Sequence, residues 1–107
     1  MSKKKTSVNE KSCSLRDVLD IIGGKWSMPI IYVLSKGKLR FKELERSIGI
    51  NTRMLVKELK NMEANGIVTR EVFATVPPTV EYTLTKKGEK LLPSIVSLHK
   101  WGQEFAE

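Results

Sequence analysis

The segment 41–71 constrains the fold more than any other part of this chain, because two helical patterns lead directly into a β-type pattern. Apolar residues recur at helical spacing from Phe41 and predict a short helix over 41–47. Asn51 is a good N-cap for a longer helix over 52–65, since its side-chain oxygen can accept a hydrogen bond from a free amide of the next turn. The segment therefore predicts a helix-turn-helix followed by a strand.

The two faces of the longer helix differ in chemistry. One face carries three apolar residues that form a core seam, Leu55, Leu59 and Met62. The opposite face carries three cations that form a ridge, Arg53, Lys57 and Lys60. A second helix with a basic outer face is typical of helix-turn-helix DNA readers. The alternative is an ordinary surface helix, which also carries lysines on its wet side.

The composition indicates the class of partner. The length of 107 residues predicts one domain. A net charge of +7 with a pI near 9.7 favours a polyanionic partner, which is more often nucleic acid than an anionic membrane surface. No apolar run is long enough to cross a bilayer, the N-terminus has no signal-peptide pattern, and a single cysteine excludes an internal disulfide. We therefore expect a cytoplasmic protein without a membrane segment.

Signals of an enzyme are absent from the sequence. It contains no glycine-rich phosphate loop, no nucleophile–base pair, and no second histidine or cysteine at metal-ligand spacing. We expect neither catalysis nor a cofactor or metal.

The N-terminal part divides at Cys13. Residues 1–12 predict a flexible basic tail, whose lysines either contact DNA phosphates or form an ordinary solvated terminus. The folded domain is predicted over 13–107 and begins with a helix at Ser14, where Asp17 completes a pattern like a capping box. A second, strongly apolar helix is predicted over 26–35, the buried centre of the domain.

The pattern changes from helical to β-type after Gly66, where a left-handed C-cap is expected. Residues 67–73 and 80–84 predict two strands joined by a proline-containing loop. A hairpin directly after a recognition helix is a wing; the alternative is a plain hairpin that covers the core. The predicted fold is mainly α with a small β-hairpin (α+β), a winged helix-turn-helix.

The C-terminal pattern predicts one helix that Thr85 caps and that reaches Phe105, with Pro93 in an early turn or at a kink. Its apolar stripe is wider than a small domain can cover, and such stripes usually mark a partner surface. We therefore predict a homodimer that forms through the first and last helices. The alternative is that these two helices pack on each other within one chain.

Several stretches in this order resemble the HxlR-type winged helix-turn-helix transcriptional regulators of bacteria. After Cys13 they are residues 19–26 (LDIIGGKW), 40–44 (RFKEL), 65–70 (NGIVTR) and 76–85 (VPPTVEYTLT). The resemblance covers nearly all of 13–105. It implies a dimeric regulator that binds a pseudo-palindromic operator in double-stranded DNA, with half-sites about one helical turn, roughly 34 Å, apart.

The residues expected to contact DNA follow from this geometry. Arg53 and Lys57 are expected at base edges, because they lie in the N-terminal half of the recognition helix. Lys60 is expected to contact phosphate, and Arg40 and Lys42 are expected to hold the DNA backbone. Asn51 and Thr52 start the recognition helix and are expected to contact phosphate or a base. Thr75 and Thr79 flank the wing tip and are expected to reach the adjacent groove. The tip itself has no Arg or Lys, so we expect the wing to contribute less than the helix.

Cys13 is a candidate redox sensor. It lies at the start of the first helix, where the helix dipole, Lys11 and Arg16 favour the thiolate. Some members of the family that the chain resembles use an N-terminal cysteine to sense oxidants or electrophiles. The alternative is an unreactive, partly buried side chain. A competing function class is a winged helix that binds a protein partner and not specific DNA, and the effector is unknown.

Overall fold

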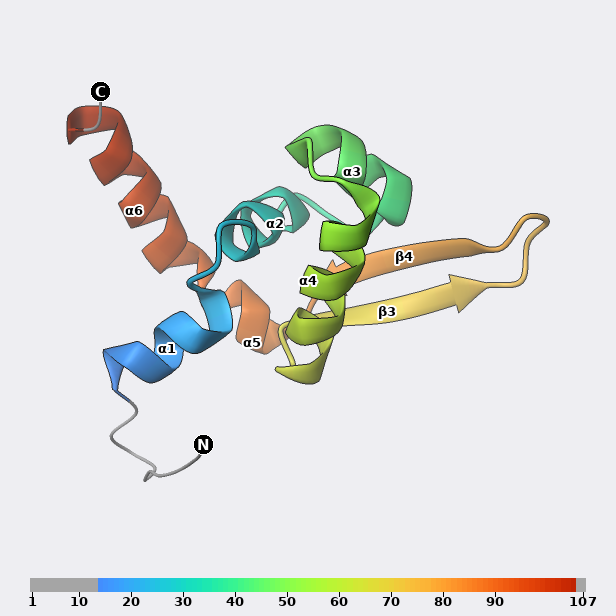
Figure 1. Cartoon of the computed structure of the whole chain (residues 1–107), viewed down its shortest axis with the longest axis horizontal. Coiled ribbons are helices and arrows are strands. Elements are labelled where there is room, and N and C mark those ends of the chain that lie inside the picture. Colours follow the sequence, from blue (N-terminus) through green and yellow to red (C-terminus); the bar gives the residue numbers. More distant parts are fainter. Residues whose placement is uncertain (1–13, 106–107) are drawn as a thin grey trace.

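The computed structural model describes residues 14–105, and its elements follow one another as a winged helix-turn-helix (Figure 1). They are α1 (Leu15–Ile22), α2 (Ser27–Leu34), β2 (Leu39–Arg40), α3 (Phe41–Ile48), α4 (Thr52–Ala64), β3 (Val68–Phe73), β4 (Thr79–Leu84), α5 (Lys86–Glu89) and α6 (Leu92–Phe105). The predicted fold class, mainly α with a small β-hairpin, is confirmed.

The three strands form an antiparallel sheet in the order β2-β4-β3. β3 and β4 pair along their full length, from Val68 opposite Leu84 to Phe73 opposite Thr79, and the hairpin projects from the body as the wing (Figure 1). The short strand β2 adds to the other side of β4, with Arg40 opposite Glu81. Since α3 begins at the next residue, this pairing fixes the start of the helix-turn-helix beside the wing.

The core lies where α2 meets the helix-turn-helix and the sheet. Ile30 and Ile31 of α2 are fully buried, as are Leu44 of α3 and Leu55 of α4. The predicted apolar seam of the recognition helix is confirmed, because Leu55, Leu59 and Met62 are each at most 1% exposed. This packing turns the basic side of the helix outward.

Short-range hydrogen bonds hold the predicted helix ends. The amide of Ser14 donates to Asp17 Oδ2 and the amide of Asp17 donates to Ser14 Oγ, both at 3.2 Å, which completes the capping box of α1. The amide of Gly88 donates to Thr85 Oγ1 at 3.0 Å at the start of α5. Gly66 has φ +74°, a left-handed conformation that glycine adopts without strain, and it ends α4 as predicted.

The prediction of a single helix from Thr85 to Phe105 is wrong. The chain forms the short helix α5, and then α6 starts at Leu92. Pro93 explains the break, because it has no amide hydrogen for the carbonyl of Glu89 and its ring would collide with that carbonyl. In the observed structure Pro93 lies in the first turn of α6, where an amide hydrogen is not needed.

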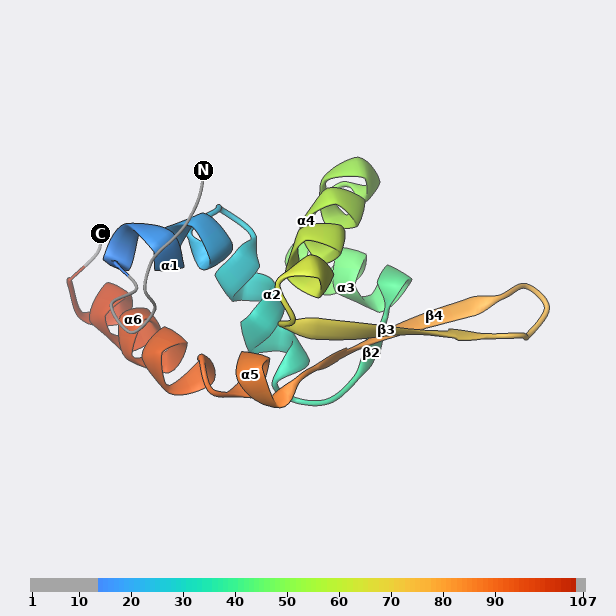
Figure 2. The same ribbon diagram turned by 90° about the horizontal axis from the view of Figure 1, so that it is seen from below.

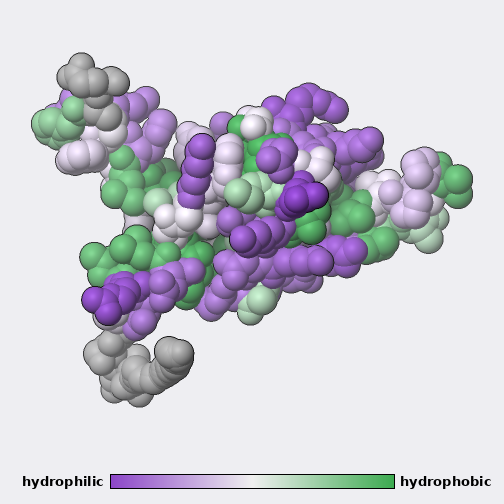
Figure 3. All heavy atoms as spheres, viewed as in Figure 1, coloured by the Kyte–Doolittle hydropathy of each residue, from purple (hydrophilic) through white to green (hydrophobic). Residues whose placement is uncertain are grey.

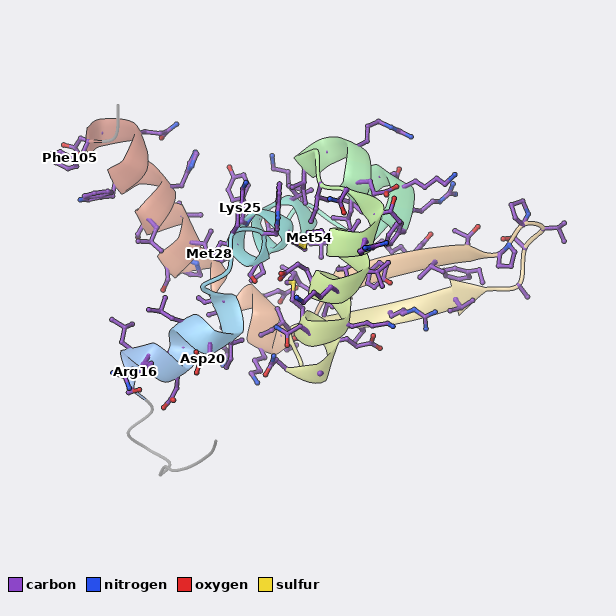
Figure 4. The ribbon with its side chains drawn as sticks, viewed as in Figure 1. Arg16, Asp20, Lys25, Met28, Met54 and Phe105 are labelled. Atoms are coloured by element: carbon purple, nitrogen blue, oxygen red, sulfur yellow. The ribbon has the colours of Figure 1, made fainter. Side chains whose placement is uncertain are left out.

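The first and last helices lie at the end of the molecule opposite the wing (Figure 2). They expose large apolar side chains, namely Leu15 (73%), Leu19 (51%), Leu98 (54%), Trp101 (61%) and Phe105 (60%). Figure 3 shows this hydrophobic surface over both helices, and Figure 4 places Phe105 at the far end of α6. Packing of α1 on α6 within one chain therefore does not cover these residues.

The predicted tail 1–12 and Cys13 lie outside the described residues. No helix within residues 14–105 has the length and apolar character needed to span a membrane.

Candidate nucleic-acid interface

The turn between α3 and α4 is closed by the side chains of two predicted site residues. Asn51 Oδ1 accepts a hydrogen bond from the amide of Met54 at 2.8 Å, and the hydroxyl of Thr52 donates to Glu45 on α3. Gly49 has φ +76°, which lets the chain reverse between the helices. Asn51 and Thr52 thus fix where the recognition helix starts, and their contact with DNA stays a prediction.

The basic ridge of α4 is open to solvent. Arg53, Lys57 and Lys60 are all exposed on the side of α4 away from the core, and Figure 3 shows hydrophilic side chains gathered over α3 and α4. Within residues 14–105 the only ion pair joins Lys38 Nζ and Glu81 Oε1, 3.7 Å apart. No carboxylate of the described part of the chain forms an ion pair with the ridge, so its three charges are available to a polyanion.

The predicted backbone-contact residues meet the wing across one groove. This groove of about 720 Å³ separates the N-terminal part of α3 from the wing tip, and Arg40, Lys42, Thr75 and Thr79 all line it. Glu43 also lines this groove, and its Oε1 accepts a hydrogen bond from the amide of Arg40 at 2.8 Å, which caps α3. The fold thus brings together four predicted residues from two distant segments.

Sequence reasoning missed Arg46, which lines the same groove as a third cation. Arg46 follows Lys42 by four residues, so the two share one face of α3. That spacing was the available signal.

Arg70 of β3 was missed as well; it lines a cleft of about 430 Å³ between α4 and the sheet together with Lys60.

The two threonines of the wing loop bond within the loop. The hydroxyl of Thr75 donates to the carbonyl of Pro77 at 2.6 Å and lies 2.8 Å from Thr79 Oγ1. Because the hydrogen of Thr75 is already used, Thr79 is the donor of this second bond. Their predicted contact with an adjacent DNA groove is not tested by these bonds, which show that both hydroxyls already shape the loop.

Hydrogen bonds from α2 and from the start of α5 hold the recognition helix and the two residues that follow it in place. Lys87 Nζ donates to the carbonyl of Asn65 at 2.8 Å, and Thr85 Oγ1 donates to the carbonyl of Gly66 at 2.6 Å. On the flank of the helix, the buried hydroxyl of Ser27 donates to Glu58 Oε1 at 3.2 Å. The basic ridge is therefore presented on a supported element, as precise recognition requires.

Residues 21–107 match the model of the HxlR-like helix-turn-helix family. The HTH-type transcriptional regulator YybR of Bacillus subtilis, itself uncharacterized, is 44% identical over 105 residues, which are 96% of this chain and 84% of YybR. The redox regulator HypR in its oxidized form superposes with a TM-score of 0.82 at 43% identity, covering 89% of this chain and 99% of HypR. A MarR-family regulator from Porphyromonas gingivalis W83 superposes with a TM-score of 0.83 at 38% identity, and the match covers 94% of this chain and 99% of that regulator.

Proposed function

We propose that this chain, which belongs to the HxlR-like helix-turn-helix family of transcriptional regulators, binds a pseudo-palindromic DNA operator as a homodimer. The observation that carries the proposal is the exposed basic ridge of α4 on a helix whose other face is fully buried. Arg53 and Lys57 read base edges, and Lys60 contacts phosphate. Because the proposed partner is chromosomal DNA, we place the protein in the cytoplasm, and no catalytic step is part of the proposal.

The rest of the helix-turn-helix holds the DNA backbone in this proposal. Arg40 and Lys42 contact phosphates from the groove beside the wing, and Asn51 and Thr52 contact DNA at the start of α4. Thr75 and Thr79 act from the wing. Phosphate contacts set the position of the protein on the duplex, while the base contacts supply specificity.

Dimerisation through α1 and α6 is supported by their exposed apolar surface. A two-fold interface uses the same patch on both copies. Each of these side chains is therefore buried once in each subunit, and its contribution counts twice for the dimer. Full burial of one such side chain stabilises an assembly by about 1.5–3 kcal/mol. The dimer would present two copies of α4 to successive major grooves, roughly 34 Å apart.

The experiment selects duplexes from a random library with the full chain and measures affinity against salt concentration for three variants. Arg53→Ala should weaken binding of the selected duplex by about 5- to 150-fold for each half-site, because an arginine fork on guanine contributes about 1–3 kcal/mol. Binding of random duplex should change less. Lys60→Ala should weaken both duplexes alike and reduce the slope of log affinity against log salt by about one per subunit. Lys90→Ala is the matched control, because Lys90 is exposed outside the interface.

Wild-type affinity for the selected duplex in both the Arg53 and Lys60 variants would contradict these assignments. A wild-type protein that selects no duplex and shows a flat salt dependence would instead support the competing class, a winged helix that binds a protein partner.

We also propose that Cys13 makes DNA binding responsive to oxidants or electrophiles. The support is the similarity to the redox regulator HypR and the position of Cys13 directly before the N-cap of α1. With one cysteine per chain, oxidation by diamide must join Cys13 to a second subunit's Cys13 or to a small thiol, whereas an electrophile would alkylate it. Operator affinity before and after diamide, with Cys13→Ser as the control, tests this: equal affinities would remove the sensor role.

A further inference from the structure

The tip of the wing is an apolar point at the most distant end of the hairpin. Val76 is 99% exposed, and Pro77 and Pro78 follow it directly. Figure 1 shows that the hairpin carries this tip well beyond the body, and Figure 3 shows hydrophobic surface there, separate from the hydrophobic surface over α1 and α6. Nothing in residues 14–105 covers the tip.

Residues of the wing loop itself fix the shape of the tip. Two prolines restrict the backbone, and the hydroxyls of Thr75 and Thr79 are bonded to each other across the base of the loop, with Pro77 as a further acceptor. These bonds engage the two hydroxyls and the carbonyl of Pro77, and the side chains of Val76, Pro77 and Pro78 between them are aliphatic carbon. A partner would meet a preorganised wedge, which loses little conformational freedom on binding.

The surroundings of the tip are cationic. Three cations, Arg40, Lys42 and Arg46, line the groove between α3 and the tip against one carboxylate, Glu43, which caps α3. Glu71 is the only charged residue in 71–79. Figure 2 shows that the wing projects away from the body and that α4 rises to one side of it. An apolar wedge beside three cations is complementary to a duplex, in which an apolar base stack is flanked by phosphates.

We propose that the tip formed by Val76, Pro77 and Pro78 enters the minor groove as an apolar wedge, while Arg40, Lys42 and Arg46 hold the adjacent phosphates. The inference rests on the proposed DNA-binding function and adds a contact made by a side chain without charge or hydrogen-bonding groups. The wedge partly unstacks one base step and bends the duplex. Specificity at that step comes from deformability, so pyrimidine–purine steps, which kink easily, are favoured there.

The test uses the duplex that the wild-type protein selects from the random library, labelled at both ends for energy transfer. Val76→Ser removes the apolar side chain, and Val72→Ser is the matched control, because Val72 is a half-exposed valine of the same hairpin away from the tip. We expect Val76→Ser to raise the Kd by about fivefold, in line with loss of a partly buried valine. The increase should be the same at every salt concentration, and the end-to-end transfer should report a smaller bend.

Two measurements distinguish an apolar wedge from a phosphate contact and from a loss of folding. Arg46→Ala should reduce the slope of log affinity against log salt by about one per subunit, whereas Val76→Ser should leave that slope unchanged. Thermal melting of Val76→Ser should match that of the wild type, because a side chain that is 99% exposed contributes nothing to the core.

The inference is overturned if Val76→Ser binds and bends the duplex as the wild type does, or if Val72→Ser has the same effect. It is also overturned if Val76→Ser changes binding of a protein partner and leaves DNA binding intact. If the wild-type protein selects no duplex at all, the proposed function itself has failed, and that result differs from a failure of the wedge alone.

Discussion

Replacement of Gly88 by alanine should destabilise the fold. Gly88 is buried in α5, where it packs against Ile67, the residue directly before β3. A Cβ at this position would meet the carbonyl oxygen of Ile67 at 2.4 Å, and the side chains of Ile67 and Leu84 at 3.2 Å each. A separation of 2.4 Å is far shorter than van der Waals contact, so the backbone must move.

The required movement disturbs bonds that hold the recognition helix. The carbonyl of Ile67 accepts from the amide of Thr85 at 2.9 Å, and the amide of Ile67 donates to the carbonyl of Met62 at 2.9 Å, in the last turn of α4. Overpacking of a dense interior costs about 1–3 kcal/mol. Alanine recovers about 0.5–1 kcal/mol through helix propensity. We therefore expect a net loss of about 1 kcal/mol in the free energy of unfolding, which lowers the Tm by about 4–8 °C.

Gly102→Ala provides the control. Gly102 lies in α6, and a Cβ added there would meet no atom within 4 Å, so the same substitution should raise the free energy of unfolding by about 0.5–1 kcal/mol. Urea unfolding of both variants should be measured at one protein concentration, because dimerisation makes stability depend on concentration. A Gly88→Ala variant as stable as the wild type would refute the reasoning.

Four further changes test the packing and the caps. Asn51→Ala removes the N-cap of the recognition helix and should lower the free energy of unfolding in urea by about 1 kcal/mol, with Asn51→Asp close to wild type. Ser27→Ala removes the donor to Glu58 and should also cost about 1 kcal/mol; greater stability would show that this bond contributes nothing. Leu55→Ala empties a fully buried site and should cost about 2–5 kcal/mol in the same assay. Trp101→Ser should shift the mass in light scattering from dimer towards monomer, and an unchanged mass would contradict the role of α6.

Helix ends were predictable because their hydrogen bonds are local. Ser14 bonds with Asp17, Asn51 with Met54 and Thr85 with Gly88, each across three residues. Such bonds depend on the side chain and the neighbouring backbone alone, so the residue type is sufficient to place them. The same holds for the two faces of α4, because helical periodicity separates Arg53 from Leu55 whatever the helix packs on.

The break between α5 and α6 was only partly contained in the sequence. Pro93 indicated either an early turn or a kink, and the apolar stripe favoured one continuous helix. The position of α5 is also tied to a contact in space, because Gly88 packs closely on the carbonyl of Ile67 at the start of β3. That contact joins segments about twenty residues apart, and no local pattern reports it.

The sequence by itself determined the order of α1 to α4 and of the β3–β4 hairpin, the caps at Ser14, Asn51 and Thr85, the basic face of α4 and the excess of apolar surface on the terminal helices. Only the tertiary structure decided that Arg40, Lys42 and Arg46 share a groove with the wing, and that Thr75 and Thr79 bond to each other beneath an exposed Val76. The physical reason is range. Caps and periodicity act within one or two turns, whereas the groove depends on the pairing of β2 with β4, which sets residues some forty positions apart side by side.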